Sequence, residues 1–117
     1  MKKENTLKKR KQFNWTFKNG KQAYEKDLVL VYTQTKSKNY KVGFSVTKKV
    51  GKAVVRNKVR RRLKAIVTTL QNQIAEKYTL IFVAKPSAAD CLFCDLEVQV
   101  KSLLKKTNLL KNYEEIS

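Results

Sequence analysis

The stretch KKVGKAVVRNKVRRRLK, residues 48–64, constrains the fold more than any other part of the chain. It holds nine basic residues and no acidic one, with an apolar residue at every third or fourth place. This spacing predicts an amphipathic helix that extends to about residue 75. Because an apolar stripe must be buried, we expect the helix to pack one side against a sheet. The stripe consists of Val55, Val59, Leu63, Ile66, Leu70 and Ile74.

The side opposite the stripe is expected to be exposed and basic. Like charges four residues apart repel by about 0.2–0.5 kcal/mol, so such repulsion over several turns indicates a partner whose phosphates neutralise it. Lys48 and Lys49 precede the positive end of the helix, where phosphates also bind. The opposite side carries Ala53, Asn57, Arg60, Arg61 and Lys64, with Arg56 at its border and Lys58 and Arg62 beside the stripe.

The charge of the whole chain supports a polyanionic partner. The 117 residues carry a net charge of +18, and the excess lies in one half. Residues 1–64 hold 21 basic and 3 acidic residues, whereas residues 65–117 hold 6 of each. This asymmetry indicates that the partner is nucleic acid or an anionic membrane. A membrane-surface helix is disfavoured, because the side opposite the charges is needed for the core.

The remaining elements predict a small α+β domain. A basic helix over residues 7–18 carries Phe13 and Phe17 on one face. Two strands, residues 28–33 and 40–47, are expected to run antiparallel. A third strand follows at residues 78–84, and a helix over residues 95–110 closes the fold.

Aromatic residues suggest a second nucleic-acid contact. Phe13 and Phe17 on a basic helix, with Tyr32 on a strand, combine aromatic faces with positive charge, as stacking of single-stranded nucleic acid requires. The alternative is that Phe13 and Phe17 fill the core, since aromatic pairs four residues apart usually pack against each other.

The polypeptide offers no recognisable catalytic machinery. It has no histidine, and its nine carboxylates are scattered singly or sit near the ends, as Glu114 and Glu115 do. Cys91 and Cys94 form a lone CLFC motif without a second ligand pair, so we interpret them as ordinary thiols rather than a metal site. Neither a membrane span nor a signal peptide is recognisable, which predicts a cytosolic protein.

The segment GFSVTKKVGKAVVRNKVRRRLK resembles the signature of the protein subunit of bacterial ribonuclease P. In that family, a strand end with the pattern G-x-S-V-[ST]-K-K leads into a basic helix with an Arg-Asn pair. LKKRKQFNWTFKNG, LVLVYT and YTLIFVAKPSA resemble the flanking helix and strands of the family, so the resemblance covers essentially the whole chain. The matching positions are Gly43, Ser45, Val46, Thr47, Lys48, Lys49, Ala53, Arg56, Asn57, Arg60 and Arg61.

The resemblance implies a fold and a function. The fold is a single α+β RNA-binding domain, residues 1–117, of order α-β-β-β-α-β-α, with a four-stranded mixed sheet and a left-handed βαβ crossover. About residues 1–6 and 112–117 are expected to be flexible. The function is that of a protein cofactor in an endoribonuclease that removes the 5′ leader from precursor tRNA. The catalytic RNA carries the chemistry with Mg²⁺, and the isolated polypeptide is expected to be inactive.

The resemblance also implies two sets of binding residues and no catalytic residue or metal ligand in the polypeptide. No membrane or small-molecule substrate is expected. The alternative from composition is a ribosomal or RNA-chaperone protein without a catalytic partner. Contacts to the catalytic RNA are expected from Lys48, Lys49, Lys52, Arg56, Asn57, Lys58, Arg60, Arg61, Arg62 and Lys64. Contacts to the leader are expected from Phe13, Phe17, Tyr32 and Ser45, in a cleft between the first helix and the sheet.

Overall fold

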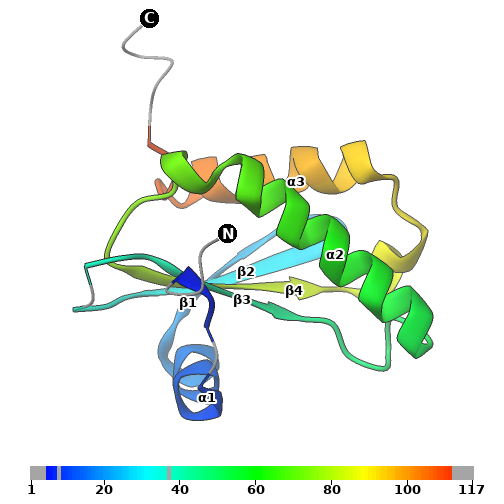
Figure 1. Cartoon of the computed structure of the whole chain (residues 1–117), viewed down its shortest axis with the longest axis horizontal. Helices are drawn as coiled ribbons and strands as arrows, with labels where there is room; N and C mark the ends of the chain where they lie inside the picture. Colours follow the sequence, from blue (N-terminus) through cyan, green and yellow to red (C-terminus); the bar gives the residue numbers. More distant parts are fainter. Residues whose placement is uncertain (1–4, 8, 37, 112–117) are drawn as a thin grey trace, which may run out of the picture.

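The computed structural model describes residues 5–7, 9–36 and 38–111, and confirms the predicted α+β order (Figure 1). Two 3₁₀ turns, η2 (Gln71–Gln73) and η3 (Pro86–Asp90), flank the last strand. The helices are α1 (Arg10–Asn19), α2 (Ala53–Thr69) and α3 (Phe93–Lys106), and the strands are β1 (Lys21–Tyr24), β2 (Leu28–Gln34), β3 (Lys41–Ser45) and β4 (Tyr78–Ala84).

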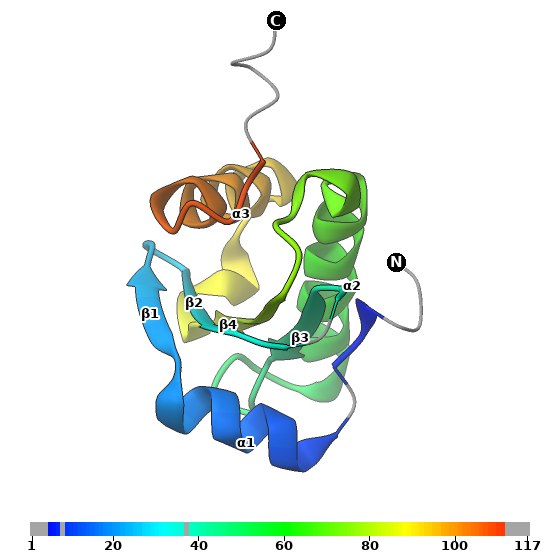
Figure 2. The ribbon, with the colours of Figure 1, turned by 90° about the vertical axis from the view of Figure 1, so that its left-hand side faces the viewer.

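The four strands form one mixed sheet in the order β1-β2-β4-β3. β2 pairs with β1 and β4 antiparallel, whereas β3 pairs with β4 parallel. β2 and β3 do run antiparallel, but β4 lies between them, because its apolar run is buried on both faces and takes a central place. The β3-α2-β4 crossover is left-handed (Figures 1 and 2), against the usual preference.

Helices cover both faces of the sheet (Figure 2). Along β2, Leu28 and Leu30 point into the main core beneath α2 and α3, whereas Val31 points to the opposite face. There it joins Leu7 and Ile81 in a smaller core under α1. This division follows from the alternation of side chains along a strand.

Both basic helices are shorter than their sequence patterns predict. α2 ends at Thr69, although Leu70 and Ile74 of its stripe are still buried in the turn that follows. α1 begins at Arg10, because Leu7 is extended and its amide donates to the Val42 carbonyl, 2.9 Å away. These differences show that burial, rather than helical periodicity alone, sets the ends.

The chain before α1 is fixed to the sheet edge as far as the structure describes it. The Asn5 side-chain amide donates to the Tyr40 carbonyl, 2.8 Å away, and Thr6 forms a bridge with Val42. Within the segments expected to be flexible, residues 1–4 and 112–117 lie outside the described residues.

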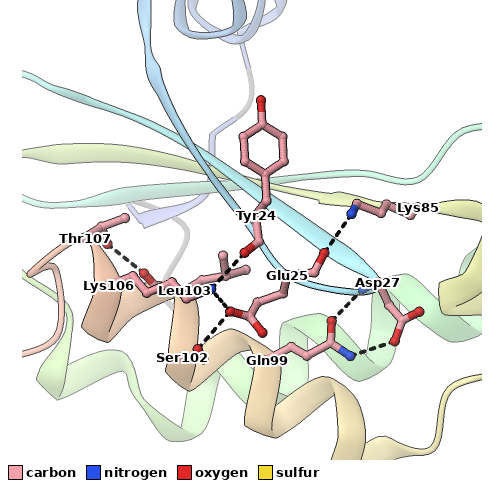
Figure 3. Close-up of polar contacts among 9 residues, drawn as sticks. All are labelled: Tyr24, Glu25, Asp27, Lys85, Gln99, Ser102, Leu103, Lys106 and Thr107. Atoms are coloured by element: carbon pink, nitrogen blue, oxygen red, sulfur yellow. Dashed lines mark hydrogen bonds and ion pairs between the residues drawn. The ribbon is translucent and has the colours of Figure 1, made fainter.

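The β1–β2 turn is held to α3 by a polar cluster (Figure 3). Glu25 forms an ion pair with Lys106 and accepts a 2.9 Å hydrogen bond from Ser102. Asp27 and Gln99 exchange two hydrogen bonds, from the Asp27 amide to Oε1 (2.8 Å) and from Nε2 to Oδ2 (2.7 Å). These contacts position β1, whose short KQAY sequence carries no clear strand pattern and was not located by periodicity.

Candidate nucleic-acid interface

The outer side of α2 is exposed and rich in basic residues. Val59, Leu63 and Ile66 are buried, while Arg61 and Lys64 are exposed on the other side of the helix. The prediction of one buried and one charged side is therefore confirmed. The α2 basic face, as we call it, consists of Lys52, Asn57, Lys58, Arg60, Arg61 and Lys64.

One pair within this face is pre-oriented. The guanidinium of Arg60 donates to the side-chain oxygen of Asn57, 3.1 Å away and one turn earlier. This bond fixes one edge of the guanidinium and leaves its remaining N–H groups for an acceptor outside the protein. The planar fork of arginine suits phosphate oxygens.

The turn before α2 adds two exposed lysines. Val50 is buried and its amide donates to the Thr47 carbonyl, so that Lys48 and Lys49 point to solvent. Gly51 has a φ of +153°, and a Cβ there would lie 3.2 Å from Val55, so glycine is required. No side chain caps the N-terminus of α2, and its first turn contains no acidic residue. This end is therefore electrically positive.

Two arginines of the predicted set lie differently. Arg62 is half-buried, and its guanidinium donates to the Cys91 carbonyl, 2.9 Å away. This position beside the apolar stripe is the predicted one, and the guanidinium is hydrogen-bonded to the chain that follows η3. Arg56 is also half-buried, and its Nε atom is buried without a hydrogen-bond partner.

Phe13 and Phe17 lie between α1 and the sheet. Their ring centroids are 5.2 Å apart, and both half-buried rings pack on the smaller core. Gly43 makes room for Phe13, because a Cβ there would lie 2.8 Å from the Phe13 ring. Each ring therefore contributes to packing, as one of the two alternatives predicts, and keeps some exposed surface, while stacking on nucleic acid stays a prediction.

Tyr32 does not lie with these rings. It packs on the main core, on the side of α2 and α3, whereas Phe13 and Phe17 lie on the other face of the sheet. The predicted grouping of Tyr32 with them is wrong, because successive residues of a strand point to opposite faces. The β2 residue that faces the rings is Val31.

Ser45 lies on the same sheet face as the two rings. The strand register aligns four residues across this face, in the order Tyr24, Val29, Val83 and Ser45. Tyr24 is 57 % exposed there and was not predicted as a site residue. Alternation could have indicated its direction only if β1 had been recognised. We call this row, together with Phe13 and Phe17, the α1-side surface.

Acidic and thiol groups gather elsewhere, beside η3. Hydrogen bonds from Cys91 and then Ser87 lower the pKa of Asp27, and burial raises the pKa of the Cys91 thiol to about 12. The thiol also lies 3.6 Å from the Ser87 carbonyl, a weaker acceptor than the carboxylate. Among the described residues, no three His, Cys, Asp or Glu side chains could together hold a metal ion. No helix in the described part of the chain is long and apolar enough to cross a membrane.

Comparison with known proteins gives one consistent family. The ribonuclease P family matches residues 1–108 of the chain. A ribonuclease P protein component from Clostridioides difficile is 39 % identical over 104 residues, which cover 88 % of this chain and 91 % of the relative. One from Bacillus velezensis is 39 % identical over 113 residues, or 95 % and 96 % of the two chains.

Solved structures show the same fold. The Staphylococcus aureus RNase P protein superposes with a TM-score of 0.84 at 24 % identity, over 92 % of this chain and 98 % of that one. The Thermotoga maritima RNase P protein gives a TM-score of 0.79 at 23 % identity, over 86 % and 96 %. With its family match, its close relatives and a positively charged helix face in the described structure, the chain belongs to the family of bacterial ribonuclease P protein components.

Proposed function

We propose that this subunit binds RNA through two surfaces: the α2 basic face binds the catalytic RNA, and the α1-side surface binds the leader. As a ribonuclease P protein component, the chain is a subunit of the ribonucleoprotein that processes the 5′ end of precursor tRNA. The observation that carries the proposal is that α2 buries one side in the core and presents basic residues, with no acidic one, on the other.

The α2 basic face binds the phosphate backbone of the catalytic RNA in this proposal. Lys48, Lys49 and the uncapped N-terminus of α2 extend the face at one end, where backbone amides and the helix dipole favour phosphate. Arg56 contributes at its border. Arg62 acts indirectly, since its guanidinium is hydrogen-bonded to the Cys91 carbonyl and holds α2 against the segment that leads into α3.

The α1-side surface contacts the single-stranded leader. Phe13 and Phe17 offer partly exposed ring surface, and Ser45 offers a hydroxyl on the same face of the sheet. An aromatic ring can stack with a base of any sequence, which suits a leader that differs from one tRNA precursor to the next. We include Tyr24, because it shares the row with Ser45, and leave out Tyr32, which packs on the other face.

The chemistry belongs to the catalytic RNA and its Mg²⁺ in this proposal. The polypeptide has no histidine to act as an acid or base near neutral pH. Its part is to bind the catalytic RNA through basic residues and the leader through aromatic residues, which holds the two RNA molecules together. We expect this to occur in the cytosol, as the sequence predicts.

Reconstitution tests the proposal. We expect the purified protein, freed of RNA, to leave precursor tRNA intact, and to increase leader removal by the cognate catalytic RNA when Mg²⁺ is limiting. The measurement is the rate of leader release with RNA alone, protein alone and both together. Correctly placed cleavage by the protein alone, or no effect of the protein on the RNA, would contradict it. The identity of the RNA that copurifies with the protein distinguishes this proposal from the ribosomal alternative. One long non-ribosomal RNA supports the present proposal, and ribosomal RNA supports the alternative.

A further inference from the structure

A cleft lies on the flank of α1 that faces away from the row of residues from Tyr24 to Ser45. It has a volume of about 560 Å³, within the range of ligand sites. One wall is the flank of α1, and the other is the end of β2 with the residues that follow it. We call it the Trp15 cleft, and its main lining residues are Lys11, Trp15, Thr16, Thr33, Lys36 and Thr79.

α1 separates this cleft from the α1-side surface. Thr33 and Thr79 are aligned across β2 and β4, two residues beyond the Val31 and Ile81 pair that α1 covers. The Val29 and Val83 pair lies two residues to the other side, in the Tyr24–Ser45 row. α1 packs on the Val31 and Ile81 pair, between these two rows, so a ligand in the Trp15 cleft would not occupy the surface proposed for the leader.

The cleft combines an aromatic ring with positive charge. Trp15 is 55 % exposed although tryptophan is a large apolar residue that folding would ordinarily bury. Lys11 and Lys36 are exposed on the two walls, and none of the described residues that line the cleft is acidic. Thr33 and Thr79 bring two hydroxyl groups, each able to donate and to accept a hydrogen bond.

We propose that the Trp15 cleft binds an unpaired segment of RNA, with one base stacked on the Trp15 indole and adjacent phosphates near Lys11 and Lys36. Aromatic stacking requires a base whose face is free, and a duplex offers none along its length. The threonine hydroxyls can bond to a base edge or a ribose 2′-hydroxyl. The positive walls without an acidic residue favour a polyanionic strand over a neutral ligand.

Trp15 is the only tryptophan of the chain, so tryptophan emission comes from this residue of the cleft alone. We would titrate the full-length protein with an eight-nucleotide oligouridylate at low salt, and follow Trp15 emission together with the anisotropy of a labelled copy. Saturable quenching of Trp15 is expected with this strand, and much weaker quenching with a duplex RNA of equal length. Binding by anisotropy with unchanged Trp15 emission would overturn the proposal.

Charge variants locate the strand. Lys11→Gln or Lys36→Gln should raise the midpoint of quenching several-fold and lower the slope of log affinity against log salt by about 0.7 for each lost phosphate contact. Lys101→Gln is the matched control, since Lys101 is an exposed lysine of α3 on the far side of the sheet. Equal shifts for Lys11→Gln and Lys101→Gln would mean unspecific attraction and would overturn the site.

Phe17→Leu tests whether the cleft is separate from the α1-side surface. It should leave the quenching midpoint within about twofold, provided that circular dichroism shows a folded protein. A loss as large as that of Lys11→Gln would show one continuous site and overturn the proposal of a second. Because the titration needs neither catalytic RNA nor precursor tRNA, its failure would leave the proposed division of surfaces standing.

Discussion

Arg61 and Arg62 are neighbours in the sequence with different surroundings in the fold. Arg61 is exposed on the α2 basic face, whereas the guanidinium of Arg62 is hydrogen-bonded to the Cys91 carbonyl. A step of about 100° around the helix is enough to separate an arginine on the exposed basic face from one that packs against the chain after η3. The role of an arginine in such a run therefore depends on its angular position more than on its charge.

Substituting each arginine separates the two roles. Arg61→Ala should weaken assembly with the catalytic RNA and lower the slope of log affinity against log salt by about 0.7 to 0.9, while the free energy of unfolding changes by less than about 0.5 kcal/mol. Arg62→Ala should lower the free energy of unfolding by about 1 kcal/mol, because the Cys91 carbonyl loses a charged donor. The salt dependence of RNA binding measures the effect of Arg61→Ala, and denaturant titration measures the effect of Arg62→Ala. A loss of stability for Arg61→Ala together with a loss of binding for Arg62→Ala would refute the assignment.

The Phe17 ring is tested by comparing two ligands. Phe17→Leu keeps apolar bulk on the smaller core but removes the aromatic face. It should cost the holoenzyme roughly 1 to 3 kcal/mol of affinity for precursor tRNA if a leader base stacks on the ring. Mature tRNA has no leader, so its affinity should be unchanged. Both affinities are measured in one buffer, and an equal loss for the two ligands would assign the ring to packing alone.

At the scale of elements, the polar cluster between the β1–β2 turn and α3 holds β1 in place, as apolar packing holds the other strands. β1 has a short, mostly exposed sequence, and the carboxylates of Glu25 and Asp27 at its end are bound by Lys106, Ser102 and Gln99 (Figure 3). Hydrogen bonding by Lys106 lowers the pKa of Glu25, and hydrogen bonds from Cys91 and Ser87 lower that of Asp27. The cluster is therefore more stabilising when both carboxyls are ionised than when they are protonated.

This cluster predicts a loss of stability in acid. A carboxyl group with a lowered pKa stabilises the folded state above its ordinary pKa, 3.8 for Asp27, and that contribution is lost as the pH falls through the lowered value. Asp27→Asn should reduce the free energy of unfolding by about 1 to 3 kcal/mol at pH 7, since Asp27 is only 4 % exposed. The difference from the unmodified protein should shrink as the pH falls below 3.8.

Denaturant titrations at pH 7 and in acid measure this difference. Asp90→Asn is the matched control, because Asp90 is an exposed carboxylate of η3. It should change the free energy of unfolding by less than about 0.5 kcal/mol. If the difference in free energy of unfolding between Asp27→Asn and the unmodified protein stayed constant as the pH fell, the charge on Asp27 would not contribute to stability.

At the scale of the whole molecule, two cores of unequal size share one sheet. The larger lies beneath α2 and α3, and the smaller, around Leu7, Val31 and Ile81, lies beneath α1. β2 and β4 contribute side chains to both cores. If the sheet came apart, the buried side chains of both cores would therefore be exposed together. The two surfaces proposed to bind RNA thereby lie on elements that fold together.

A single unfolding transition is expected from this arrangement. Trp15 fluorescence reports on α1, whereas far-ultraviolet circular dichroism reports on all helices and strands. Since both cores depend on the same strands, the two signals should give the same midpoint in thermal or denaturant unfolding. An earlier midpoint for Trp15 would show that α1 separates from the sheet on its own.

The sequence by itself determined the amphipathic design of α2, the α+β class and the polyanionic partner, because periodicity and charge are local properties. The stripe from Val59 to Ile66 could be predicted as buried, and β4 was placed correctly. The grouping of Tyr32 with Phe13 and Phe17 was wrong, and the hydrogen bond from Arg62 to the Cys91 carbonyl was not predicted, since each depends on which element lies opposite. Only the tertiary structure decided those contacts, the strand order, the place of β1 and the cleft beside Trp15, because they join residues distant in the chain through packing that no local pattern encodes.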